Sequence, residues 1–339
     1  MRELAGRLLA LDPEASETLK VIAYFDRLID GRVGAEGMLR GAATLAGAPV
    51  GHARPGAERG RRFGPDAASL PDGSPDGWPS VGFGEGAVVW LERSGEAHAN
   101  DAMVLERLAI ALSILSTRLD TVAPTRQAVE TLVSADATDE QRDEALQRLA
   151  LPVHVPVHAV AVPTGVPLAT AAPHAVVATR FGVVRAVLTV VDATGLAPSA
   201  GIGVAAHVAG EIPQSWRSAL IALRLADPSR PVVRADELGA LLALFEVEDQ
   251  RAVPHPDVDA VGRALAAHWT ESLLRGLSAG ASHRALAAEA GVHHSTMGAR
   301  VRELTPMLGF DPATPVGRTR LDVALMLYRL ANTRFDGER

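Results

Sequence analysis

The sequence contains no cysteine among its 339 residues. This absence excludes a disulfide framework and thiolate metal sites such as zinc fingers. Lysine is almost absent as well, because Lys20 is the only one and arginine carries nearly all of the positive charge. Together with the abundance of Ala, Gly, Val and Pro, this composition indicates a genome rich in G and C rather than a particular function.

Long apolar runs are also missing. The longest apolar region, residues 174–191 (HAVVATRFGVVRAVLTVV), contains Arg180 and Arg185 and falls short of the roughly 20 residues that a bilayer requires. The first residues, MRELAGRLLALDPEASE, alternate charges with short apolar runs, which predicts an amphipathic helix rather than a signal peptide. We therefore expect a cytoplasmic protein without a membrane partner.

The length and the charge distribution indicate several domains. A chain of 339 residues with 47% hydrophobic residues predicts two or three domains of ordinary size, and we expect three. The formal net charge is -7, whereas residues 281–339 carry eight arginines against six acids, so the remainder carries -7 - 2 = -9. The C-terminal end is thus the mildly basic part of an acidic chain.

Residues 1–120 predict a compact α+β domain. Its expected elements are two helices, a segment of strands and turns, a strand and a long helix, at 15–30, 35–46, 47–80, 87–93 and 99–120. An arginine cluster lies in the turn-rich segment, and an exposed hairpin is a simpler interpretation of it than a site for an acidic partner; it comprises Arg54, Arg59, Arg61 and Arg62.

Three further segments follow. Residues 121–152 are polar and predict a helical connector, and residues 153–250 predict a second domain in which strands and helices alternate. The elements expected there are strands at 155–163, within 174–191 and at 232–234, a glycine-bearing segment at 201–205, and helices at 214–226 and 235–245. Residues 251–339 predict an all-helical domain.

Motifs for catalysis and for cofactor or metal binding are lacking. GIGVAA at 201–206 satisfies a loose G-x-G-x-x-A, but no helix follows directly and no acid ends the next strand. His154 and His158 share one side of a predicted strand at a spacing of roughly 13 Å, too far apart for one ion. No nucleophile elbow or carboxylate pair is present, so we expect no enzyme, cofactor or metal.

The most informative stretch is SHRALAAEAGVHHSTMGARVREL, residues 282–304. Ser282 is a candidate N-cap, a short helix extends to Ala290, Gly291 marks a turn, and a second helix begins near His294. This layout predicts a helix-turn-helix. Inward positions are expected at Leu286, Ala287, Ala290, Met297, Val301 and Leu304.

The other face of the second predicted helix has short or polar residues. The helical period turns Ser295, Ala299 and Arg302 outward, with Thr296, Gly298 and Glu303 beside them. Short hydrogen-bonding groups at a helix start allow contact with phosphates and base edges, whereas a buried helical hairpin requires no particular outer face. Gly298 costs a helix about 1 kcal/mol relative to alanine, which close approach of the backbone to DNA would explain.

We accordingly predict binding of double-stranded DNA, most of it through the second helix. The candidate DNA-binding residues are Ser282, Arg284, His293, His294, Ser295, Thr296, Gly298, Ala299, Arg300 and Arg302.

Residues 291–330, GVHHSTMGARVRELTPMLGFDPATPVGRTRLDVALMLYRL, resemble the C-terminal helix-turn-helix of PucR/CdaR-like bacterial transcriptional regulators. The matching positions are Val292, His293, Thr296, Arg300, Leu308, Gly309, Arg320, Leu321 and Leu327. The resemblance implies phosphate contacts by Thr296 and Arg300. His294-Ser295 and Gly298-Ala299 depart from the family pattern, so its base-reading roles are not transferred.

Upstream segments extend this resemblance. AGIGVAAHVAGEIPQSWRSALIALRLA and VVRADELGALLALF are similar to the family's degenerate cyclase-like (GGDEF-derived) α/β domain, and the first 120 residues are similar to the GAF-like α+β sensor of actinobacterial members. The hairpin VATRFGVVRAVL contains no acid where a working cyclase holds metal, which implies a silent interaction domain.

The resemblance implies a multidomain α+β transcriptional regulator that works as a homodimer or larger oligomer and is controlled through its sensor, with a possible small-molecule effector. The alternative is a regulatory scaffold that has lost DNA binding, which the weak basic charge and Gly298-Ala299 favour.

Overall fold

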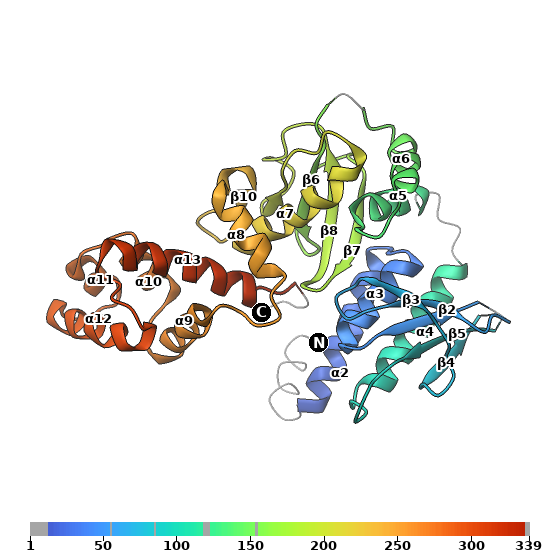
Figure 1. Cartoon of the computed structure of the whole chain (residues 1–339), viewed down its shortest axis with the longest axis horizontal. Coiled ribbons are helices and arrows are strands. Elements are labelled where there is room, and N and C mark those ends of the chain that lie inside the picture. The colour runs from blue at the N-terminus through green and yellow to red at the C-terminus, as the bar shows by residue number, and fades with distance from the viewer. Residues whose placement is uncertain (1–12, 55, 85, 118–122, 153–154, 336–339) are drawn as a thin grey trace. The chain divides into compact units, whose positions relative to one another are not determined.

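The computed structural model describes residues 13–54, 56–84, 86–117, 123–152 and 155–335 (Figure 1). The chain divides into two compact units, one formed by residues 1–236 with 334–339 and the other by residues 237–333. The larger unit has mixed α and β structure with two sheets, and the smaller unit is helical. In the described part of the chain, no helix combines the length and the apolar character needed to cross a membrane.

The first sheet of the larger unit has five antiparallel strands in the order β3-β2-β1-β5-β4. Its elements are β1 (Val50–Ala53), β2 (Gly60–Phe63), β3 (Ser69–Gly73), β4 (Ser80–Phe83), β5 (Ala87–Leu91) and the helices α2 (Pro13–Asp30), α3 (Ala35–Ala46) and α4 (Asp101–Thr117). The predicted elements of this region are present. The helix expected at residues 1–17 lies mostly outside the described residues.

Alternation along the strands gives this sheet one apolar face. Val50, Phe63 and Leu91 are fully buried and belong to the same core as Leu28 of α2 and Leu108 of α4. Paired strand residues share a face, so Val50 opposite Phe63 and Leu91 builds a continuous apolar layer. Helices α3 and α4 therefore pack on this face of the first sheet, and α2 packs against α4 and α3.

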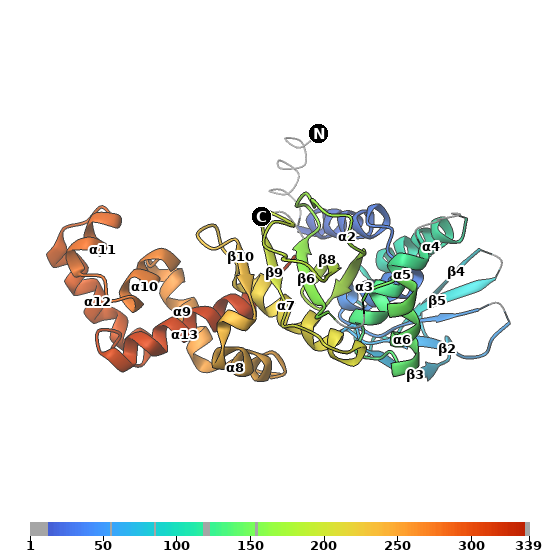
Figure 2. The same cartoon turned by 90° about the horizontal axis from the view of Figure 1, so that it is seen from above.

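The second sheet has the order β10-β9-β6-β8-β7, with β9 and β10 parallel and the other pairs antiparallel (Figure 2). The strands are β6 (His158–Pro163), β7 (His174–Thr179), β8 (Gly182–Thr189), β9 (Ala200–Ile202) and β10 (Val232–Arg234). The helices α5 (Ala123–Val133), α6 (Asp139–Arg148) and α7 (Ile212–Leu225) contribute to the core on one face of this sheet.

The glycines of GIGVAA serve helix packing. A Cβ on Gly201 would lie 2.1 Å from the Ala219 carbonyl oxygen and 2.2 Å from the Leu223 nitrogen, both in the backbone of α7. A Cβ on Gly203 would lie 2.0 Å from the Ser215 oxygen. The two glycines therefore let α7 contact the sheet backbone, which gives the motif a role without any phosphate.

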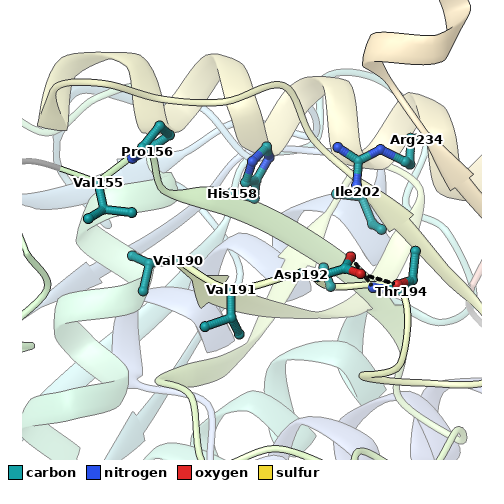
Figure 3. A pocket seen from close by; sticks show the side chains of 10 residues that line it. Val155, Pro156, His158, Val190, Val191, Asp192, Thr194, Ile202 and Arg234 are labelled. Atoms are coloured by element: carbon teal, nitrogen blue, oxygen red, sulfur yellow. Dashed lines mark hydrogen bonds between the residues drawn. The ribbon is translucent and has the colours of Figure 1, made fainter.

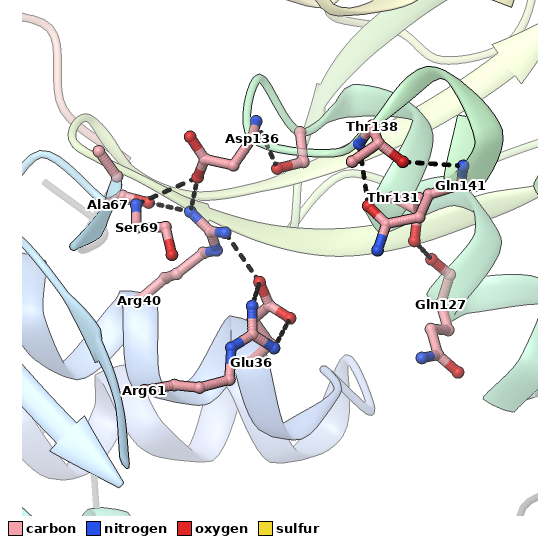
Figure 4. Close-up of polar contacts among 12 residues, drawn as sticks. Glu36, Arg40, Arg61, Ala67, Ser69, Gln127, Thr131, Asp136, Thr138 and Gln141 are labelled. Atoms are coloured by element: carbon pink, nitrogen blue, oxygen red, sulfur yellow. Dashed lines mark hydrogen bonds and ion pairs between the residues drawn. The ribbon is translucent and has the colours of Figure 1, made fainter. Parts of the chain in front are cut away.

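The segment 121–152, expected as a connector, packs as α5 and α6 into the second sheet's core: Val129 and Leu132 are fully buried there. The turn between these helices also contacts the first sheet's module (Figure 4). The Asp136 carboxylate accepts from Arg40 at 3.0 Å and from the Ser69 nitrogen at 3.1 Å. These contacts tie the two sheets of the larger unit together.

The same network includes part of the arginine cluster. Arg40 pairs with Glu36 at 2.8 Å, and Arg61 pairs with Glu36 at 3.0 Å (Figure 4). Arg62 pairs with Glu92. The cluster thus lies in and around the β1–β2 hairpin, and two of its members form ion pairs within this unit.

The helical unit begins within the short 3-10 turn η2 (Asp236–Leu238). Its helices are α8 (Ala240–Asp249), α9 (Pro256–Ala267), α10 (Glu271–Ser278), α11 (His283–Glu289), α12 (His294–Leu308) and α13 (Pro315–Asn332). Helices α9 to α13 share a core that includes Val261, Leu274, Met297, Leu304 and Leu321. Compactness places α8 with this unit, although the sequence assigned residues 235–245 to the preceding domain.

Candidate nucleic-acid interface

Helices α11 and α12 and the turn between them form the predicted helix-turn-helix. The Ser282 side chain accepts from the Ala285 nitrogen at 3.2 Å, so Ser282 is the N-cap of α11. Gly291 has a φ of 65°, and the Val292 nitrogen donates to the Ala287 oxygen at 2.9 Å. This left-handed glycine with a bond back to the last turn is a Schellman ending. It stops α11 and redirects the chain into α12.

The predicted inward residues lie in the core of the helical unit. Leu286 and Ala287 of α11 are buried, as are Met297, Val301 and Leu304 of α12. Ala290 is half-buried beside them. The spacing of 297, 301 and 304 follows the helical period, so burial of this stripe leaves the opposite face of α12 in solvent.

The exposed face of α12 carries most of the predicted contacts. Ser295, Thr296 and Arg302 are exposed, and Ala299 and Arg300 are half-buried. Arg284 is exposed on α11. Within the described residues, Arg284, Arg300 and Arg302 form no ion pair with an acid of the chain. Their guanidinium groups therefore remain available to an external anion.

Gly298 does not lie on this face, and the prediction of its orientation was wrong. The residue is buried, and a Cβ on it would lie 3.6 Å from His283 Nδ1 and 3.9 Å from Arg302 Nη1. His283 is the first residue of α11, so the atom nearest to this Cβ position belongs to the other helix of the motif. Close approach of a DNA backbone to Gly298 therefore does not explain the glycine.

The two neighbouring histidines differ in their contacts. His293 precedes α12 as its N-cap, with Nδ1 accepting from the Ser295 nitrogen at 3.4 Å and lying 2.8 Å from Ser295 Oγ. His294 is the first helical residue, is exposed, and its ring centroid lies 4.1 Å from that of His293. His293 thus orders the first turn of α12, whereas the His294 ring projects from it.

A supporting ion pair, which the sequence did not reveal, joins α9 to α13. The Arg320 guanidinium donates two hydrogen bonds to the Asp257 carboxylate, each at 2.8 Å, and lies 4.4 Å from the Phe310 ring centroid. The hydrogen bonds and charge of Arg320 hold the pKa of Asp257 below its usual range, against the opposing effect of burial. The partners are 63 residues apart, so no local pattern predicts the contact.

A pocket of about 450 Å³ lies in the second sheet's module, where β8, β9 and β10 end (Figure 3). Its polar groups already have partners in the chain. His158 Nδ1 lies 2.9 Å from the Gly203 oxygen, and Arg234 pairs with Asp236 at 2.8 Å. Asp192 accepts from the Thr194 hydroxyl at 2.7 Å, which lowers the pKa of Asp192. Because these polar groups are already bonded within the chain, the pocket offers few groups that could bind a specific ligand.

Metal ligands do not gather in the described residues, where no three histidine, aspartate or glutamate side chains form a group able to hold an ion. His154, one half of the histidine pair rejected from its spacing, lies outside the described residues.

One comparison with known proteins concerns this interface directly. Residues 270–327 match the family model described as the PucR C-terminal helix-turn-helix domain, a segment that begins at the N-cap of α10 and ends within α13. No curated protein matches the chain.

A crystal structure of a regulator of polyketide synthase expression from Bifidobacterium adolescentis is similar at 17% sequence identity. The likeness covers 65% of this chain and 98% of that chain, with a TM-score of 0.28, which is too low to support an argument about this fold. The sequence match and the α11–α12 geometry agree: the helical unit carries a segment that matches the PucR C-terminal helix-turn-helix domain at residues 270–327.

Proposed function

We propose that the protein is a DNA-binding transcriptional regulator of the PucR/CdaR type and that α12 is its recognition helix. The observation that carries the proposal is the exposed, polar first turn of α12 above a buried α11–α12 crossing, within the segment that matches a known helix-turn-helix domain. In such motifs the second helix enters the major groove with its N-terminal residues at base edges.

The positions on α12 divide the proposed contacts into two groups. His294, Ser295 and Arg302 are exposed, and we assign them to base edges. Thr296 is exposed and Arg300 is half-buried, and we assign both to phosphates. Ser282 and Arg284 at the start of α11 supply a second phosphate contact, through the helix N-terminus and one charge.

The remaining parts of the chain complete the proposal. Residues 1–120 form a GAF-like sensor that responds to a small-molecule effector, and residues 153–250 form a degenerate cyclase-like domain without catalytic activity. The α+β composition of both modules and the lack of an acid in Arg180-Phe181-Gly182 support this scheme. The contacts of Asp136 between the two modules offer a route for the signal.

The test is a salt titration of full-length protein on fluorescent genomic DNA fragments. Arg300→Ala and Thr296→Ala should weaken binding across many sequences, and loss of one arginine–phosphate contact lowers the slope of log affinity against log salt by about one. Arg148→Ala, on the exposed side of α6, is the matched control and should change nothing.

The alternative, a regulatory scaffold without DNA binding, makes the opposite forecast. If the protein is such a scaffold, the wild-type protein should not be retained on DNA, even at low salt. A third outcome is that the wild type binds DNA and that Arg300→Ala has the same slope of log affinity against log salt. That result would support the DNA function but contradict the proposed orientation of α12.

A further inference from the structure

Inside the larger unit, the helices of the first sheet pack directly against β7 of the second sheet. Val176 and Ala178 of β7 belong to the same core as Leu28 of α2. A Cβ on Gly31, just after α2, would lie 2.6 Å from Val176 Cγ2. A Cβ on Gly41 of α3 would lie 3.3 Å from the Ala178 Cβ. These two glycines thus allow a close approach, and the two modules share an apolar boundary.

Glu130 of α5 joins the second sheet's module to the start of α3. Its Oε1 accepts from the Gly34 nitrogen at 3.2 Å, and a Cβ on Gly34 would lie 3.1 Å from its Oε2. Gly34 is the N-cap of α3 and offers no side-chain cap. The carboxyl group that lies against this helix start therefore comes from another module, 96 residues along the chain.

The surroundings of Glu130 disfavour its ionised form. Burial raises the pKa of Glu130 to about 7, and the negative charge of Glu36 in the first turn of α3 acts in the same direction. The hydrogen bond from Gly34 and the positive charges of Arg40 and Arg126 oppose this rise and do not cancel it.

The nearest cation on α3 is shared among several acids. Arg40 pairs with Glu36 at 2.8 Å and with Asp136 at 3.0 Å (Figure 4). Two carboxylates already bind this guanidinium, which limits its help to a third. Strand β7, which packs against both α3 and α5, has His174 as its one titratable side chain, at its exposed first residue.

We propose that Glu130 is a proton-binding site that controls how firmly the second sheet's module holds the start of α3. With the proton bound, the neutral carboxyl group keeps an oxygen that accepts from the Gly34 nitrogen. With the proton released, the carboxylate is better solvated by water than at this boundary, so the contact between α5 and α3 loosens. The site lies entirely within residues 1–236, so its action does not depend on DNA binding.

The direction of the pH effect follows from the raised pKa. The folded chain keeps the Glu130 proton up to a pH of about 7, whereas the group released from its contact titrates near its ordinary value of 4.5. The closed contact therefore weakens as the pH rises through this window, and the weakening is complete above the raised pKa.

Carbon-13 NMR of the full chain, labelled at the glutamate carboxyl carbons, follows the proton itself. The resonance that is absent from Glu130→Gln belongs to Glu130, and it should titrate with a midpoint near pH 7. A midpoint below pH 5 would overturn the proposal.

Hydrogen exchange of the Gly34 amide in the full chain follows the contact. Its protection factor, which is corrected for the intrinsic effect of pH on exchange, should fall about tenfold between pH 6 and pH 8 in the wild type. Glu130→Gln keeps an acceptor that cannot ionise, so its protection should stay constant over this range. Unchanged amides of α7 would show that the variant is folded.

A matched control changes an exposed glutamate of the same module. Glu140→Gln in α6 should leave the pH dependence of Gly34 as in the wild type. A protection factor of Gly34 that does not change with pH in the wild type would overturn the proposal without any variant. An equal pH dependence in the wild type and in Glu130→Gln would overturn it as well, because another group would then be responsible.

Discussion

At the scale of the residue, Gly298 is a helical glycine whose surroundings have room for a Cβ. Its missing Cβ would make only ordinary van der Waals contact with His283 and Arg302. We therefore expect Gly298→Ala to stabilise α12 by about 1 kcal/mol, because alanine loses less backbone entropy than glycine in a helix.

The measurement for Gly298→Ala is hydrogen exchange of α12 amides in the full chain, where about 1 kcal/mol corresponds to roughly fivefold slower exchange. Ala299→Gly, one position along on the half-exposed side, is the opposite control and should speed exchange by a similar factor. Faster exchange in Gly298→Ala would mean that the neighbouring His283 ring cannot accommodate a methyl group.

His293 is the second prediction at this scale. Its imidazole nitrogen caps the α12 backbone, so His293→Ala should destabilise the first turn by about 1 kcal/mol. His293→Asn, which supplies another capping acceptor, should keep most of that stability. The protection of the Ser295 amide reports the cap directly, and equal protection in wild type and His293→Ala would show that the ring contributes nothing.

At the scale of the element, the Asp257–Arg320 pair fixes the start of α9 to α13. Asp257→Asn removes a charge-assisted, two-bond contact, and we expect a loss of about 1 kcal/mol near neutral pH, a modest value because the Arg320 side chain is 47% exposed. Asp259→Asn, exposed in the same turn of α9, controls for loss of an acid near the helix start.

The pH dependence of this contribution follows from the lowered pKa of Asp257. A carboxyl whose pKa is depressed in the folded state stabilises the fold above its unfolded pKa, about 3.9 for aspartate, and this contribution fades as the pH falls through the folded pKa. The difference in the free energy of unfolding between wild type and Asp257→Asn should therefore shrink as the pH drops. Hydrogen exchange measures this difference at neutral pH, and chemical denaturation measures it in acid. A difference that persists unchanged in acid would contradict an ionic origin.

At the scale of the whole molecule, the proposed DNA function requires a second copy, because one helix-turn-helix reads a short site and two-fold operators are bound by symmetric dimers. Helix α8 offers an apolar contact for it: Leu244 is 42% exposed and Val247 is 64% exposed, one turn apart. We expect the full chain to scatter light as a dimer.

The double substitution Leu244→Asp with Val247→Asp should convert that dimer to a monomer. Val253→Asp, a change at a 72% exposed valine outside α8, should leave the dimer intact. If the double variant is still a dimer, the dimer contact lies elsewhere than on α8. If the wild type is a monomer at tens of micromolar, the prediction of a dimer is wrong.

Several features of this protein were predictable from short stretches of sequence because their causes are local. Ser282 caps α11 because its hydroxyl reaches a backbone nitrogen three residues on, and Gly291 ends that helix because it adopts a left-handed conformation readily. The stripe of Met297, Val301 and Leu304 is buried because the helical period puts all three on one side. The mixed α+β composition and the two helices at 13–30 and 35–46 follow from the same kind of pattern.

Other features were decided only by the tertiary structure, because they are contacts between residues that are distant in the chain. The sequence could not show that His283 lies beside Gly298, that Asp257 pairs with Arg320, or that α5 and α6 join the core of the second sheet. It could not show that Phe335 docks on Phe181, since 154 positions separate the two residues and no periodicity links them. Local propensity acts over one or two turns, whereas these contacts arise from the way whole elements bury their apolar faces against each other.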